Sequence, residues 1–158
     1  MTAIIRPAIA GDIPAMVELL RLLFTLEADF TYAGDRQRRG LELLLAAPQA
    51  RVAVAEVDGR AVAMATAQLL ISTAEGGPAL SIEDVVVAPQ HRRQGLARLL
   101  LAHLALWGEG HGARRLQLLA DRDNSAALLF YQRLGWRHTQ LICLRAYGIE
   151  DDRESAVT

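Results

Sequence analysis

Hydrophobic and polar residues recur with a helical period through the first third of the chain. Residues 13–24 place apolar side chains three and four positions apart, as an amphipathic helix does, and Asp12 stands at the position of its N-cap. A second helix of this kind is expected from Asp35, as its cap, to about Pro48. Because residues 3–6 read as a short strand, the pattern predicts one strand followed by two helices.

The period changes to two in the middle of the chain. Residues 51–57 and 60–71 alternate and are rich in β-branched side chains. The Asp58-Gly59 pair between them favours a two-residue hairpin turn, since both positions tolerate a positive φ. Residues 80–87 form a further run of this type, so three consecutive strands are expected.

A helical period returns from about Gln94 and is stopped by the glycines between 108 and 112. A strand at 115–120, a short helix at 125–134 and one or two terminal strands within 136–147 complete the pattern. The predicted order is β-α-α-β-β-β-α-β-α-β. Helices then cover a mixed sheet, and the fold class is α/β or α+β.

Length and composition favour a single domain. A chain of 158 residues with 52% hydrophobic residues can bury one core. We expect this domain to span residues 1–147 and the acidic segment 148–158 to be a frayed tail.

Overall charge and cysteine content restrict the partners and the compartment. A net charge of −1 and 5% aromatic residues disfavour nucleic-acid binding, and no apolar run reaches the ~20 residues of a membrane span. Cys143 is the only cysteine, which suits a reducing, cytoplasmic location. The four histidines lack the spacing of metal ligands, so no metal is expected.

A basic turn stands between the strand that stops at Pro89 and the following helix. Backbone amides at a helix N-terminus have no partner within the helix and face the positive end of its dipole, so they can bind an anion. Gly95 and Ala97 leave room for a phosphate group, and arginines at 92, 93 and 98 add positive charge. An ordinary solvated connection is the alternative interpretation.

Two motifs resemble one known family. Arg92-Arg93-Gln94-Gly95-Leu96-Ala97 matches the Arg/Gln-x-x-Gly-x-Gly/Ala signature of the GCN5-related N-acetyltransferase (GNAT) superfamily, and residues 124–136 resemble its second cofactor motif, Asn-x-x-Ala-x-x-Phe-Tyr-x-x-x-Gly-Trp/Phe. Together the motifs span about Leu80 to Arg137. The resemblance implies the GNAT acyl-CoA N-acyltransferase fold, with the predicted elements in the family's usual order.

The same resemblance implies acetyl-coenzyme A as cosubstrate. The strand backbone at Val85 and Val87 would bond the pantetheine arm, and the turn from Arg93 to Arg98 would hold the pyrophosphate. Arg93 departs from the family, which often has glycine there. The implied cofactor-binding residues are Val85, Val86, Val87, Arg92, Arg93, Gln94, Gly95, Leu96, Ala97, Arg98 and Asn124.

Two adjacent carboxylates, Glu83 and Asp84, interrupt an apolar strand, where alternation predicts that they occupy opposite faces. A buried unpaired charge is costly, so each needs water, a partner or a function. A Glu-Asp pair stands at this point of the strand in the polyamine acetyltransferase branch, which the chain resembles here. The resemblance implies that Glu83 is the base and Asp84 a structural carboxylate; pairing of both with nearby arginines is the alternative.

Asn124 and Tyr131 are seven positions apart and share a helix face, whereas Ala127, Phe130 and Leu134 define the core face. The resemblance implies that Tyr131 is the general acid beside the coenzyme A sulfur and that Asn124 lies near the pantetheine. The alternatives are a boundary tyrosine with a solvated hydroxyl and a helix N-cap at Asn124.

The expected function is transfer of an acetyl group from acetyl-coenzyme A to a primary amine of a small molecule: an amine, a polyamine or an amino-acid-like compound. Acidic and aromatic residues of the first two helices, Phe24, Glu27 and Tyr32, would suit a cationic acceptor. A coenzyme A-binding regulatory module, an acetyltransferase for protein N-termini or lysines, and nucleic-acid binding through the basic turn are the alternatives. Residues 140–147 could pair across a homodimer.

Overall fold

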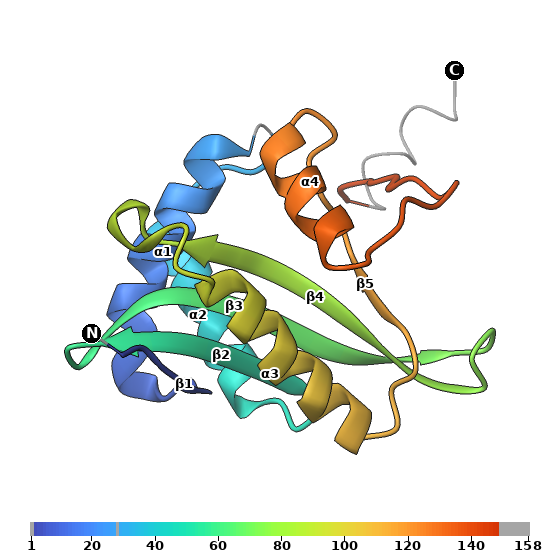
Figure 1. Cartoon of the computed structure of the whole chain (residues 1–158), viewed down its shortest axis with the longest axis horizontal. Helices are drawn as coiled ribbons and strands as arrows, with labels where there is room; N and C mark the ends of the chain where they lie inside the picture. Colours follow the sequence, from blue (N-terminus) through green and yellow to red (C-terminus); the bar gives the residue numbers. More distant parts are fainter. Residues whose placement is uncertain (1, 28, 149–158) are drawn as a thin grey trace. The chain divides into compact units, whose positions relative to one another are not determined.

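The computed structural model describes residues 2–27 and 29–148, which fall into two compact units, Met1–Asp121 and Arg122–Thr158. The expected single domain over 1–147 stays a prediction, and the expected tail lies outside the described residues apart from Gly148. The elements follow in the order of Figure 1: β1 Ile4–Pro7, α1 Ile13–Leu26, α2 Gly34–Ala46, β2 Ala50–Val57, β3 Arg60–Ser72, β4 Gly77–Val87, α3 Leu96–Gly110, β5 Leu116–Leu118 and α4 Ser125–Arg133, with short 3₁₀ helices at Ala10–Asp12 and Pro89–His91.

The first unit contains a five-stranded sheet in the order β1-β2-β3-β4-β5. The first three pairings are antiparallel, and β5 joins β4 in parallel after the crossover through α3. This mixed sheet with covering helices confirms the predicted fold class.

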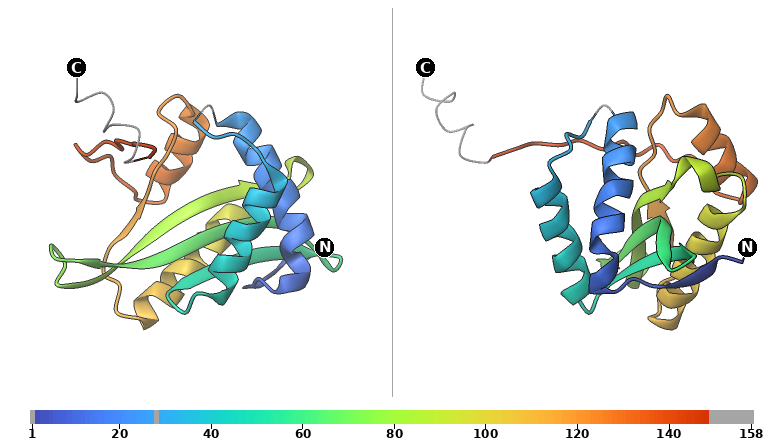
Figure 2. Two further views of the ribbon diagram at one scale, coloured as in Figure 1. Left: turned by 180° about the vertical axis from the view of Figure 1, so that it is seen from behind. Right: turned by 90° about the vertical axis from the view of Figure 1, so that its left-hand side faces the viewer.

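Helices cover both faces of this sheet, α1 and α2 on one side and α3 on the other (Figure 2). On the α3 side, Arg51 of β2 lies over the Trp107 ring, 5.4 Å from its centroid. A Cβ built on Gly108 would lie 2.9 Å from Cδ2 of Leu80, so glycine at this position lets α3 approach β4 closely.

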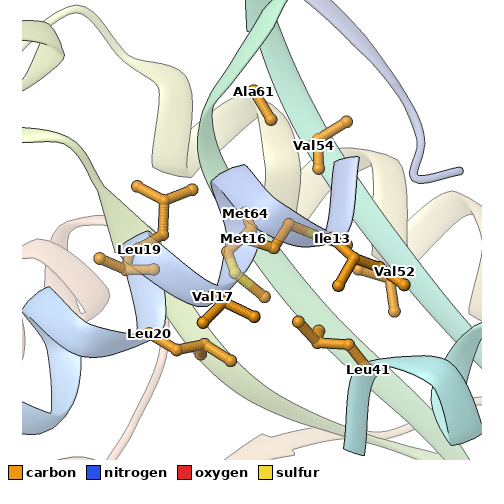
Figure 3. Packing of buried hydrophobic residues seen from close by; sticks show 11 residues of the cluster. Ile13, Met16, Val17, Leu19, Leu20, Leu41, Val52, Val54, Ala61 and Met64 are labelled. Atoms are coloured by element: carbon orange, nitrogen blue, oxygen red, sulfur yellow. The ribbon is translucent and has the colours of Figure 1, made fainter. Parts of the chain in front are cut away.

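The core on the opposite face is made of α1, α2 and the central strands. Met16 and Leu41 from the helices pack with Val54 and Met64 from the sheet, and each is at most 2% exposed (Figure 3). Burying an aliphatic side chain of this size contributes roughly 1.5–3 kcal/mol. Val86 of β4 belongs to the same cluster, so the strand that carries the candidate chemistry is anchored in the core.

A charged network joins the beginning of the chain to the sheet. The Arg6 guanidinium donates to both carboxylate oxygens of Asp12, at 2.7 and 2.9 Å, and to Glu56 at 2.6 Å. The hydrogen bonds from Arg6 hold the pKa of Asp12 below its usual range. Asp12 is the N-cap residue of α1, as predicted, but its side chain makes no cap hydrogen bond to that helix; the carboxylate instead accepts the Ile9 amide at 2.8 Å.

The other local predictions met different outcomes. Asp58 and Gly59 have φ angles of 51° and 76° between β2 and β3, which confirms the hairpin turn. The N-cap of α2 is Ala33, whose amide donates to Gln37 Oε1 at 2.7 Å, so the prediction that Asp35 caps this helix is wrong.

The terminal strand expected within 136–147 is absent from the described residues, which run irregularly from 136 to 148. The apolar side chains that suggested it are 72–86% exposed in the structure: Leu141, Ile142, Leu144 and Tyr147. An apolar, alternating pattern reports only a preference for extended backbone. A strand also requires a neighbouring strand for its backbone hydrogen bonds, and residues 136–148 form no strand in the structure.

Candidate active site

The connection from β4 to α3 forms a tight turn at the N-terminus of α3. Arg93 and Gly95 both adopt left-handed backbone conformations, with φ angles of 61° and 78°. The helix begins at Leu96, slightly later than the predicted Gln94, and Gly95 is its N-cap. A non-glycine residue is strained in this region of φ. This explains why the family that the chain resembles often has glycine at the position of Arg93.

The turn presents backbone amides and arginines to solvent. The first bond of α3 runs from the Leu99 amide to the Gly95 carbonyl at 3.1 Å, so the amides of residues 96–98 precede it at the positive end of the helix dipole. The Leu96 side chain is buried and anchors the turn, whereas Gly95 is exposed. A Cβ built on Gly95 would meet nothing within 4 Å, so the space before these amides is open to an anion.

The β4 strand ends next to this turn. Among the described residues, β5 pairs with β4 at Leu80–Ile82, and the part of β4 from 83 to 87 has strand pairing on the β3 side. The other backbone edge at Val85 and Val87 is therefore where an extended arm of a cosubstrate could bond. The Arg92 Nε donates to the Val87 carbonyl at 3.2 Å, and this arginine would share that acceptor with a bound pantetheine amide.

A β-bulge interrupts β4 immediately before that edge. Glu83 pairs with Thr66 and Val86 pairs with Met64, so three steps along β4 match two along β3. Asp84 accommodates the extra residue with a φ of 54°. Paired residues share a face, and the Asp84 Oδ2 lies 3.3 Å from Thr66 Oγ1, so Glu83 and Asp84 both lie on the Thr66 side. The prediction of opposite faces is wrong because it assumed an uninterrupted strand.

The two carboxylates differ in their surroundings. Glu83 is exposed, and Asp84 is half-buried. Burial raises the pKa of Asp84 to about 6, the charge of Glu83 acts in the same direction, and the hydrogen bond from Thr66 opposes both. Among the described residues, arginine ion pairs form with Asp12, Glu56, Glu18 and Glu75 rather than with this pair. The geometry therefore does not support arginine pairing as the explanation of Glu83 and Asp84.

More acidic groups gather beyond the C-terminal end of α1. Burial raises the pKa of Glu27, and the nearby carboxylates raise it further in the order Asp84, Asp121, Asp29 and Glu83. Phe24 packs on Phe30 with ring centroids 5.3 Å apart. Tyr32 packs partly on the core, and its hydroxyl occupies the space that a Cβ on Gly34 would need, at 2.9 Å. The three predicted acceptor residues thus lie in the same α1–α2 region, and Glu27 is electrostatically coupled to β4.

The second unit carries the other motif on α4. Asn124 is the N-cap of α4, and its Oδ1 accepts the Ala127 amide at 3.1 Å. Tyr131 contacts the rings of Phe130 and Trp136 edge-on, at 5.2 and 5.8 Å between centroids. The capping interpretation of Asn124 is confirmed, while the cofactor role of Asn124 and the acid role of Tyr131 stay predictions.

Sequence reasoning missed Thr66 and gave Asp84 only a structural role. The signal for Thr66 was a hydroxyl inside the apolar run from Ala61 to Ala67, where a polar side chain needs a partner. The bulge that brings Thr66 next to Asp84 contains no glycine or proline, so nothing in the sequence signals its position.

Two further properties concern residues 2–27 and 29–148. Within these residues, no group of three or more His, Cys, Asp or Glu side chains is arranged to hold a metal ion, and the sequence-based expectation of no metal stays a prediction. None of the helices in the same ranges has the length and apolar character needed to cross a membrane.

Sequence comparison links the chain to acetyltransferases. Residues 13–136 match the model of the acetyltransferase (GNAT) family. The chain is 35% identical over 78 residues to streptothricin acetyltransferase of Streptomyces lavendulae, covering 49% of this chain and 41% of that protein. It is 26% identical over 92 residues to aminoglycoside N(6')-acetyltransferase type 1 of Salmonella typhimurium, covering 56% and 63%. It is 32% identical over 100 residues to [ribosomal protein bS18]-alanine N-acetyltransferase of Escherichia coli, covering 63% of each. The matched segments thus span from two fifths to just under two thirds of these relatives.

Solved structures share the fold over nearly the whole chain. An acetyltransferase of Trypanosoma brucei superposes with a TM-score of 0.72 at 25% identity, covering 92% of this chain and 100% of that one. The complex of AAC(6')-Iy with the bisubstrate analogue CoA-S-monomethyl-acetylneamine gives a TM-score of 0.79 at 22% identity, covering 94% and 99%. The family match covers both motifs and most of the folded chain, and the chain therefore belongs to the GNAT family of acetyltransferases.

Proposed function

We propose that this protein transfers the acetyl group of acetyl-coenzyme A to a primary amine. The observation that carries the proposal is the turn at the N-terminus of α3, where left-handed Arg93 and Gly95 turn open backbone amides toward solvent. Such a turn binds a phosphate through main-chain donors. The turn follows β4 in the chain after a short 3₁₀ helix. The edge of β4 at Val85–Val87 suits the arm of the cosubstrate that links its pyrophosphate to its thioester.

The residues of the turn fit a pyrophosphate. The space before Gly95 is open, and the side chains of Arg92, Arg93 and Arg98 are exposed around it. Acetyl-coenzyme A supplies the activated acetyl group when bound. The chain then has three tasks: to orient the thioester, to take a proton from the acceptor ammonium, and to stabilise the sulfur as it leaves.

The β4 carboxylates and Tyr131 are the candidates for the two proton transfers. The Glu83–Asp84 pair lies on the strand that would carry the cosubstrate, and the sequence-based hypothesis names Glu83 as the base. Tyr131 is the proposed donor to the leaving sulfur. Its support is the match of α4 to the family's second motif, in which this tyrosine follows the capping Asn124 by seven residues.

The acceptor is proposed to be a small cationic amine. Glu27 lies among several carboxylates at the end of α1, and such a region favours a cationic molecule. Two of the relatives are named for streptothricin and aminoglycoside acceptors, which supports a small molecule. The relative named for the alanine of a ribosomal protein supports the alternative, a protein N-terminus.

A thiol-release assay with acetyl-coenzyme A tests the proposal. The acceptor panel should contain polyamines, an aminoglycoside, streptothricin, and peptides with N-terminal alanine. We expect release to depend on an amine and to be fastest with multiply cationic small molecules. Thiol release from no member of the panel would refute the proposed function, and preference for the peptides would move the acceptor to the alternative class.

The role of Tyr131 has a matched control in the same unit. Tyr131→Phe should lower kcat by about 100-fold, the order of magnitude of general acid catalysis, with little change in KM for acetyl-coenzyme A. Tyr147→Phe removes the hydroxyl of a 79% exposed tyrosine and should match the wild type. Equal kcat in both variants would exclude Tyr131 as the acid. The cytoplasmic location and the homodimer stay predictions from the sequence.

A further inference from the structure

Thr66 is a buried hydroxyl whose hydrogen bonds lead to the β4 bulge. It is 2% exposed in the apolar part of β3. Its Oγ1 lies 3.2 Å from the Glu83 carbonyl oxygen and 3.3 Å from the Asp84 Oδ2, so its single proton can be donated to either acceptor. Both acceptors belong to the bulge. The Thr66 side chain therefore contacts both the irregular backbone at Glu83 and the Asp84 carboxylate, whose direction the bulge changes.

A hydroxyl can satisfy Asp84 in either protonation state. It has one proton to donate and two lone pairs to accept. When Asp84 is ionised, Thr66 donates to the carboxylate. When Asp84 is protonated, the carboxyl O–H can donate to Thr66 Oγ1 while the hydroxyl turns to the Glu83 carbonyl. Asp84 can therefore gain and lose a proton without leaving a buried polar group unpaired, which would be costly.

The groups that face Asp84 are negative. Glu83 lies beside it on β4, and Glu27, which follows the end of α1, is electrostatically coupled to it. Burial, and after it the charge of Glu83, raises the pKa of Asp84 to about 6. A carboxyl with this pKa is still ionised at neutral pH and accepts a proton more readily than an ordinary aspartate. Glu83 itself is exposed to solvent.

From this geometry we propose that Asp84, rather than Glu83, takes the proton of the acceptor amine, and that Thr66 is its positioning residue. The inference rests on the proposed function and specifies its base. Asp84 removes one proton from the ammonium and becomes a carboxylic acid. The freed nitrogen forms a bond to the acetyl carbon as the carbon–sulfur bond breaks. The sulfur takes a proton from Tyr131 and leaves as a thiol, the nitrogen loses a second proton that restores Tyr131, and Asp84 returns its proton to water, so that one proton is released in total.

Substitution of each carboxylate separates the two candidates. Asp84→Asn should lower kcat/KM for the amine by about 100-fold or more and remove the acidic limb of its pH profile. Glu83→Gln should keep at least tenfold more activity than Asp84→Asn. Its acidic limb should move to lower pH, because a neighbouring negative charge is lost. Asp58→Asn, in the β2–β3 hairpin turn, is the control for loss of a carboxylate at a residue with positive φ.

Thr66 has a pair of variants that distinguish positioning from structural support. Thr66→Val keeps the shape but removes the hydrogen bond to the ionised Asp84. The pKa of Asp84 should rise, and the acidic limb should move to higher pH with a lower kcat. Thr66→Ser restores the hydroxyl and should restore both. Carboxyl ¹³C NMR of the protein without acetyl-coenzyme A should show the same rise in the pKa of Asp84, independently of turnover.

The outcomes are separable. An acidic limb that disappears in Glu83→Gln but persists in Asp84→Asn would overturn the proposal and favour Glu83. An unchanged Asp84 titration in Thr66→Val would overturn the positioning role. If the wild type acetylates none of the amines, the proposed function fails, and the base role fails with it; a working enzyme that is insensitive to Asp84→Asn refutes the base role alone.

Discussion

The anion-binding role of the α3 turn can be tested by adding one methyl group. Gly95 has a φ of 78°, and a Cβ there would meet nothing within 4 Å of the free protein. Gly95→Ala therefore introduces backbone strain without a steric clash. The left-handed conformation costs an L-residue about 1–2 kcal/mol, and the stiffer unfolded chain offsets about 0.4–1 kcal/mol of this. The expected loss of stability is about 1 kcal/mol.

Gly59 provides a matched control. Its φ is 76°, and a Cβ there would also meet nothing within 4 Å. Gly59→Ala should therefore cost about the same 1 kcal/mol, which lowers Tm by roughly 2–4 °C in a chain of this size. It lies in the β2–β3 hairpin turn, away from the α3 turn in sequence, and should leave coenzyme A affinity unchanged.

Affinity then distinguishes the two variants. A pyrophosphate bound to the amides of the turn would occupy the open space before Gly95, which the added methyl group reduces. We expect Gly95→Ala to weaken coenzyme A binding at least tenfold, or about 1.4 kcal/mol, in a calorimetric titration. Equal losses of stability with equal coenzyme A affinities in both variants would refute the assignment of the pyrophosphate to this turn.

Three further predictions concern stability. Because the folded pKa of Asp84, about 6, lies above the ordinary value of 3.8, its ionised form opposes folding as pH rises from 3.8 to 6. Asp84→Asn should thus raise the free energy of unfolding by up to about 3 kcal/mol at pH 8, and urea titrations should show this gain shrinking toward pH 4. An equal gain at both pH values would contradict this prediction. Asp12→Asn breaks the paired hydrogen bonds with Arg6 and should lower the free energy of unfolding by about 2–3 kcal/mol at pH 7. The wild type should lose the same contribution as pH falls through the lowered pKa of Asp12. A Tm of Asp12→Asn equal to that of the wild type at pH 7 would count against this prediction. Gly108→Ala should lower Tm, because the added methyl group clashes with Leu80 and reduces the free energy of unfolding by about 1–3 kcal/mol. A higher Tm, from the better helix propensity of alanine, would disprove the close-packing argument.

Much of the fold could be predicted because its causes are local in sequence. The spacing of apolar residues in α1 and α3 records which side of each helix faces the sheet. Asp58-Gly59 determines its turn by its own backbone preferences. The turn at the start of α3 was predictable for the same reason, since a strand end, a glycine and a helix start are adjacent in the chain.

The failures have non-local causes. At the N-cap of α1, the Asp12 carboxylate bonds to Arg6 of β1 instead of to an amide of the helix, and the N-cap of α2 is Ala33 rather than Asp35. The terminal strand was inferred from apolar alternation, yet its formation depends on a partner strand that the pattern does not contain. The faces of Glu83 and Asp84 depend on where β4 gains a residue relative to β3, which is a property of the pairing.

Backbone strain connects these non-local features to the proposed chemistry. Three non-glycine residues of the described chain have a positive φ: Asp58, Asp84 and Arg93. Asp58 adopts it in the hairpin turn, Asp84 in the β4 bulge and Arg93 in the turn before α3. Asp84 and Arg93 stand on either side of the segment 85–92, where the β4 edge leads into the anion-binding turn. Each such conformation costs on the order of 1–3 kcal/mol and persists only where its surroundings enforce it. It occurs at both ends of the proposed acetyl-coenzyme A segment, once in the proposed base, so the surrounding structure holds the backbone at each end of that segment.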